Sequence, residues 1–141
     1  MTTEDKELLM RDLCARLPYG VKVSVSYGFG QPEIKKLCVV HISQLMGNSC
    51  TIKPYLRPLS NMTEEERKEL IRLFGLNHAI VPGADGMSWY HFPDLGIESV
   101  EFIFGDIHKL LDWLNAHHFD YRGLIKMGLA LEAPEGMYNF K

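Results

Sequence analysis

The residues of this chain best suited to chemistry form a short cluster, His117, His118 and Asp120. Imidazole and carboxylate groups can bind a divalent metal ion or exchange protons as acid and base. Adjacent residues on a helix point about 100° apart, however, so His117 and His118 would rarely reach one ion. The structural alternative makes one histidine a cation at a helix C-terminus and Asp120 an N-cap. We therefore expect no metal site and no cofactor, and keep a metal-dependent or His/Asp hydrolase as an alternative function.

Tyr121 and Arg122 follow directly and are predicted to contact a ligand or a partner. An arginine offers a planar fork to carboxylate or phosphate, and clusters of aromatic residues with arginine are favoured at interfaces. Equally, Tyr121 could dock on the core while Arg122 pairs with an acid. Trp89 and Tyr90 present a similar choice, since they form a binding patch if exposed and core if buried. They add a third hypothesis, a sensor with a small-ligand pocket near Trp89 and Arg122.

The cysteines are the remaining candidates, because a thiol nucleophile needs partial exposure and a histidine beside it. Cys38 and His41 are three residues apart, which on the strand expected there puts them on opposite faces and predicts no pair. Cys14 and Cys38 are expected to be buried among apolar residues, and Cys50 to be more exposed. An odd number of cysteines, 3, without CxxC spacing indicates reduced thiols in a cytoplasmic protein.

Periodicity and capping signals indicate the elements that must position these groups. A helix is expected from Thr2, which can form a capping box with Asp5, to Pro18, which ends it. A second helix opens at Thr63, where Glu66 completes another capping box. The other expected elements are strands at 21–26, 34–42, 51–53, 88–92 and 99–104, an extended connector at 53–59, a helix at 106–117 and a last strand near 129–133.

Length and composition bound the class of protein. The chain has 141 residues, of which 46% are hydrophobic and 23% charged, and this favours one globular domain over residues 1–141. We expect an α+β fold, a small antiparallel sheet with about three helices packed on one face. A formal net charge of -3 argues against sequence-independent nucleic-acid binding and gives no reason to expect a membrane surface as partner.

Three blocks of the chain carry a resemblance: 10–20, which reads MRDLCARLPYG; 53–66, which reads KPYLRPLSNMTEEE; and 112–125, which reads DWLNAHHFDYRGLI and continues through GLALEAP at 128–134. Together they resemble a family of small proteins of unknown function from gut-bacterial (Bacteroides-like) genomes and their phages. The resemblance implies a cytoplasmic protein connected with a mobile element, and it implies no reaction. No complete catalytic constellation is present, so the leading hypothesis is a non-enzymatic interaction or accessory protein whose partner is another protein or a second copy of itself.

Overall fold

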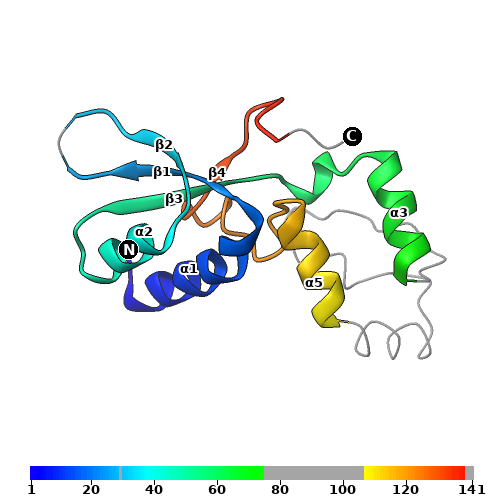
Figure 1. Ribbon diagram of the computed structural model, residues 1–141, viewed down its shortest axis with the longest axis horizontal. Helices are drawn as coiled ribbons and strands as arrows, with labels where there is room; N and C mark the ends of the chain where they lie inside the picture. The colour runs from blue at the N-terminus through cyan, green and yellow to red at the C-terminus, as the bar shows by residue number, and fades with distance from the viewer. Residues whose placement is uncertain (29, 75–106, 139–141) are drawn as a thin grey trace. The chain divides into compact units, whose positions relative to one another are not determined.

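The computed structural model describes residues 1–28, 30–74 and 107–138, which combine helices with a sheet (Figure 1). The α+β class expected from the sequence is confirmed. The chain divides into two compact units, here called the first unit (Met1–Arg57 with Leu124–Lys141) and the second unit (Pro58–Gly123). The strands expected at 88–92 and 99–104, with Trp89 and Tyr90, lie outside the described residues.

The first unit contains a four-stranded sheet in the order β2-β1-β3-β4. Its strands are β1 (Lys22–Ser26), β2 (Glu33–Lys36), β3 (Thr51–Leu56) and β4 (Leu131–Glu132). Strand β1 pairs antiparallel with β2 and with β3, whereas β4 runs parallel to β3. The sheet is therefore mixed, where an antiparallel sheet was expected. A parallel neighbour requires a long crossover connection, and the chain between β3 and β4 supplies it.

Two helices cover one face of this sheet, α1 (Thr3–Arg16) and α2 (Val39–Met46), as Figure 1 shows. The predicted capping box starts α1, since Thr2 and Asp5 bond each other's backbone N–H groups. The core between helices and sheet consists of alternate strand residues and the inner helix faces: Leu9, Leu13, Val21, Val23, Val25, Leu37, Ile42, Leu45, Cys50, Ile52, Leu56, Leu124, Leu129 and Ala130.

The strand expected at 34–42 is wrong beyond Lys36, because the chain turns there and forms helix α2. The β-branched pair Val39 and Val40 suggested a strand, yet both side chains stay exposed, at 67% and 60%. Ile42 and Leu45 are buried instead, at the three-residue spacing of one helix face. Burial of that face outweighs the strand preference of the two valines.

The expected placement of the cysteines is also wrong. Cys14 and Cys38 are exposed and Cys50 is buried. Cys14 lies on the outer face of α1, next to the buried Leu13 rather than in line with it. Cys38 lies at the N-cap of α2, where the chain leaves the sheet edge. Cys50 directly precedes β3 and joins the core, and burial raises the pKa of its thiol.

The second unit holds helices α3 (Glu64–Phe74) and α5 (Ile107–Ala116). The predicted capping box before α3 is confirmed, since Thr63 and Glu66 bond each other's backbone N–H groups at 3.0 and 3.1 Å. These helices belong to a separate core, so only α1 and α2 of the described helices join the core of the sheet. The second core contains Leu59, Met62, Leu70, Leu110, Trp113, Leu114, Phe119 and Tyr121. Short 3-10 turns at Leu17–Tyr19 and Leu59–Asn61 complete the described elements.

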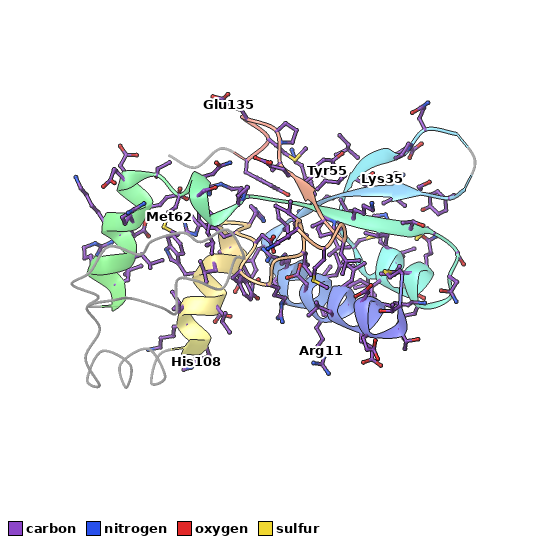
Figure 2. All side chains as sticks on the ribbon, turned by 180° about the vertical axis from the view of Figure 1, so that it is seen from behind. Arg11, Lys35, Tyr55, Met62, His108 and Glu135 are labelled. Atoms are coloured by element: carbon purple, nitrogen blue, oxygen red, sulfur yellow. The ribbon has the colours of Figure 1, made fainter. Side chains whose placement is uncertain are left out.

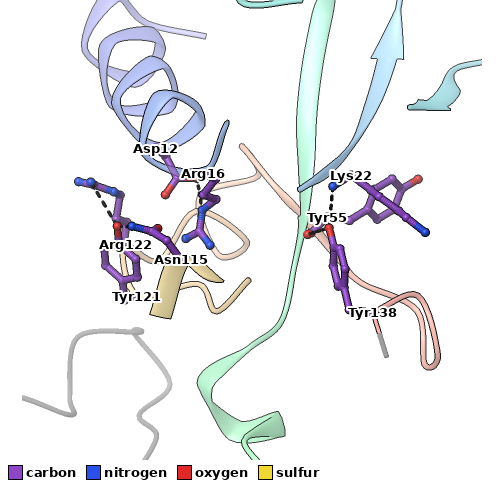
Figure 3. A network of polar contacts seen from close by, with 8 residues as sticks. All are labelled: Asp12, Arg16, Lys22, Tyr55, Asn115, Tyr121, Arg122 and Tyr138. Carbon is purple, nitrogen blue, oxygen red and sulfur yellow. Dashed lines mark hydrogen bonds and ion pairs between the residues drawn. The ribbon is translucent and has the colours of Figure 1, made fainter. Parts of the chain in front are cut away.

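A tyrosine closes the ladder between β1 and β3 (Figure 3). The Tyr138 hydroxyl accepts a hydrogen bond from the Lys22 backbone N–H and donates one to the Tyr55 carbonyl, each at 2.8 Å. Lys22 and Tyr55 would be the next opposed pair after Val23 and Pro54, so the hydroxyl bridges the two strands where they separate. Burial raises the pKa of Tyr138 to about 12.

Candidate functional site

The histidines proposed as acid, base or metal ligands lie at the C-terminal end of α5 in structural roles. The His117 ring stacks on Trp113 with the ring centroids 3.9 Å apart, and its Nδ1 lies 2.9 Å from the Trp113 carbonyl. His118 takes a left-handed backbone conformation with φ of 62° and is only 5% exposed, as is Asp120. Such a residue commonly ends a helix, as the structural alternative requires.

These side chains do not assemble into a metal centre. Across residues 1–28, 30–74 and 107–138, no group of three histidine, cysteine or acidic side chains is placed to hold a metal ion. His117 faces an aromatic ring and a carbonyl oxygen, neither of which is a second metal ligand of the kind that zinc sites use.

Tyr121 and Arg122 are close together, but the tyrosine faces inward (Figure 3). Tyr121 is 5% exposed, and its hydroxyl donates to Asn115 Oδ1 at 2.9 Å. The guanidinium of Arg122 lies 5.1 Å from the centroid of the Tyr121 ring, a cation–π distance. This is the docked arrangement that the sequence left open as the alternative to a ligand contact.

The pocket expected near Trp89 and Arg122 includes a residue outside the described part of the chain. A different hollow, of about 480 Å³, lies in the first unit beside α1 and the start of β3. Its wall is mainly apolar, with one acid and one base, and includes Asp5, Leu9, Ile52, Lys53, Met127 and Leu129.

The sheet face opposite α1 and α2 was not found by sequence reasoning; we call it the open face. By strand alternation and register it carries Lys22, Ser24 and Ser26 of β1, Ile34 and Lys36 of β2, Thr51, Lys53 and Tyr55 of β3, and Leu131 of β4. Three of these nine residues are lysines and none is acidic. Within the described part of the chain none of the three lysines forms an ion pair.

Two of these lysines, Lys22 and Lys36, are directly opposed across β1 and β2. Like charges in opposed positions on a sheet repel and destabilise it. The neighbouring Lys35 lies on the other face, where it pairs with Glu33 at 3.2 Å (Figure 2). The open face therefore concentrates positive charge that the described residues leave uncompensated.

Strand β2 is an edge strand and is exposed along its whole length. The Leu37 N–H donates to the Val21 carbonyl at 2.9 Å, so the backbone groups of Leu37 face β1. Alternate residues of an antiparallel strand face the same way, so the N–H and C=O groups of Ile34 and Lys36 point away from β1. The free edge thus presents backbone donors and acceptors together with Ile34 and Lys36 side chains on the open face.

A thiol and an imidazole meet at the end of this edge, which the sequence reasoning had excluded. Cys38 Sγ lies 3.5 Å from His41 Nδ1, and that nitrogen accepts a hydrogen bond from the Cys38 backbone N–H at 3.1 Å. Burial, followed by the positive charge of Lys35, lowers the pKa of His41. A spacing of three residues separates side chains on a strand but joins them in the first turn of a helix. Recognising a helix after Lys36 would have revealed the pair.

Comparison of the chain with protein-family models, with curated proteins and with solved structures gives no match. Among the helices that the structure describes, none combines the length and the apolar character needed to cross a membrane. The function therefore has to be argued from the geometry of the open face and its edge.

Proposed function

We propose that this chain is a protein-interaction module that binds an acidic, extended segment of a partner protein along β2. The observation that carries the proposal is the coincidence of a free strand edge with uncompensated lysines on the same residues' side of the sheet. A peptide that adds as a further strand gains affinity from main-chain hydrogen bonds and specificity from alternate side chains. The setting would be a bacterial or phage-infected cytoplasm, as the resemblance described above implies.

The chemistry of the edge favours an acidic occupant. An added antiparallel strand would bond to the outward backbone groups of Ile34 and Lys36, and the residues opposite them would share the open face. A carboxylate opposite Lys36 would lie beside that ammonium group and relieve its repulsion with Lys22. Lys53 lies two strands farther from the edge than Lys36, so its contribution would be smaller.

A nucleic acid is the less suitable partner. Single-stranded nucleic acids bind to sheet faces through stacked aromatic side chains, and the open face carries one aromatic residue, Tyr55. The formal net charge of -3 would also oppose a polyanion as long as a nucleic acid. A short acidic peptide meets the lysines without spanning the rest of the surface.

The test is fluorescence anisotropy with a labelled peptide that alternates glutamate with valine. We expect saturable binding that weakens as salt is raised. Lys36→Gln should weaken it by up to about fivefold, the range for an exposed ion pair. Lys35→Gln is the matched control, because it makes the same charge change on the other face of the same strand.

Two further peptides separate strand addition from simple charge attraction. A peptide with glutamine in place of glutamate should bind more weakly, and one with a central proline should lose binding because proline cannot donate to the ladder. Equal weakening by Lys35→Gln and Lys36→Gln, or full retention by the proline peptide, would overturn the proposal. Tighter binding of a single-stranded RNA of equal charge would also overturn it.

A further inference from the structure

The pair at the start of α2 differs from the other two thiols of the chain. Cys50 is buried in the core of the first unit, and Cys14 is exposed on α1 with no histidine contact among the described residues. Cys38 alone of the three combines exposure with an imidazole nitrogen 3.5 Å from its sulfur. A nucleophile and a base within reach of each other are the minimum for an activated thiol.

Capping does not explain why cysteine and histidine occupy these positions. The two residues reproduce the reciprocal contacts of a capping box, with the Cys38 side chain toward the His41 N–H and the His41 side chain toward the Cys38 N–H. Serine, threonine, aspartate or asparagine at the first position and glutamate or glutamine at the fourth perform this role best, as at Thr63 and Glu66. The residues present supply a nucleophile and a base instead.

The surroundings suit an electron-rich sulfur. Because His41 Nδ1 accepts from the Cys38 N–H, the neutral ring carries its proton on Nε2 and its Nδ1 lone pair faces the sulfur as well. The first turn of α2 contains no acidic residue, and backbone N–H groups at a helix start favour negative charge. The exposed side chains of Val39 and Val40 follow directly, so the sulfur lies at an accessible surface.

We propose that Cys38, with His41 as its base, is a modification site that undergoes thiol–disulfide exchange with low-molecular-weight disulfides. The Cys38 thiol gives its proton to His41 Nδ1 as its sulfur attacks one sulfur of the small disulfide. A new S–S bond forms to Cys38 and the old S–S bond breaks. The departing sulfur leaves as a thiolate and takes the proton from the imidazolium, so one thiol is released for each Cys38 modified.

The test follows the reaction of the folded protein with glutathione disulfide at pH 7, using intact mass and peptide mapping to assign each site. We expect Cys38 to be modified about tenfold faster than Cys14, the gain expected from a positioned base at the lower end of such effects. Cys38→Ser should abolish the fast phase, and Cys14→Ser, the matched control, should leave it unchanged. Both exposed thiols are measured in one sample, so this comparison requires no change in α2.

The role of His41 is tested by its pH dependence. His41→Gln should slow modification of Cys38 about tenfold at pH 7 and less than twofold at pH 9.5, where hydroxide replaces the base. A loss of rate that is equal at both pH values would indicate a structural role and overturn the assignment of the base. Equal rates at Cys14 and Cys38 in the unmodified sequence would overturn the site itself. Neither readout needs the acidic partner, so the result is independent of the proposed function.

Discussion

Two segments of this chain carry residues able to do chemistry, and the fold uses them differently. In the segment 113–122 the histidines, the aspartate and the tyrosine are buried or stacked and hold the second unit together. In the segment 34–41 a hydrophobic residue, a lysine and a cysteine are exposed along a free strand edge and the start of a helix. Residue type alone did not distinguish the two segments, whereas burial does.

The largest expected effect tests the structural character of 113–122. Phe119 is 0% exposed and its ring lies 6.0 Å from that of Trp113. Phe119→Ala would remove a fully buried ring and leave a cavity, so we expect the free energy of unfolding to fall by about 3–5 kcal/mol. Urea denaturation followed by circular dichroism measures it. A loss below about 1 kcal/mol, the scale of an exposed position, would contradict the burial of this segment.

A smaller loss is expected at Tyr121, where the ring stays and only the hydroxyl is removed. Tyr121→Phe leaves the Oδ1 of Asn115, a residue that is 4% exposed, without this donor. We expect a loss of about 1–2 kcal/mol in the free energy of unfolding, the cost of an unmet buried acceptor. The same denaturation experiment applies. An unchanged midpoint would mean that the hydroxyl is solvated, and would reopen Tyr121 as a ligand contact.

The bridge at Tyr138 has a predicted pH dependence. Tyr138→Phe should lose about 1 kcal/mol at pH 7, because the bonds to Lys22 and Tyr55 disappear. Burial raises the pKa of Tyr138 in the folded chain from 10.0 to about 12, so the fold binds its proton more tightly than the unfolded chain does. Its contribution is complete below pH 10 and is lost as the pH rises toward 12.

The measurement for Tyr138 is the unfolding midpoint of both chains from pH 7 to 12. The stability difference between the wild-type chain and Tyr138→Phe should stay constant up to about pH 10 and then narrow. A difference that widens above pH 10, or that is absent at pH 7, would contradict the bridging role of the hydroxyl.

The smallest effect is expected on the exposed segment. Val40 is 60% exposed, so Val40→Ala should change the free energy of unfolding by no more than about 0.5 kcal/mol. The same substitution type at a buried valine, Val23→Ala, is the control and should cost clearly more. If both variants lose equally, Val40 is covered in solution and the contrast between the two segments disappears.

The sequence predicted those parts of the fold that local signals determine. Both capping boxes and strand β1 follow from residues within a few positions of one another, and they are confirmed. The segment after Lys36 was mispredicted because Val39 and Val40 favour a strand locally, while burial of Ile42 and Leu45 depends on distant residues. The error also hid the candidate thiol, since the geometry of Cys38 and His41 depends on which element they form.

The open face could not be predicted from one chain for a similar reason. Lys22 and Lys36 become neighbours only through the register of β1 on β2, and Lys53 joins them only through the register of β3. Register depends on long-range packing of the buried face, which the order of residues within a strand does not specify. By contrast, the structural use of His117 and Asp120 was among the alternatives that the sequence left open.

Residue-resolved amide hydrogen exchange, with and without the acidic peptide, tests strand addition at β2 most directly. The N–H groups of Ile34 and Lys36 point away from β1, and that of Lys35 points toward it. We predict that the peptide slows exchange at Ile34 and Lys36 and leaves residues 113–122 unchanged. Unchanged exchange at both Ile34 and Lys36 under saturating peptide would contradict the account, as would protection confined to 113–122.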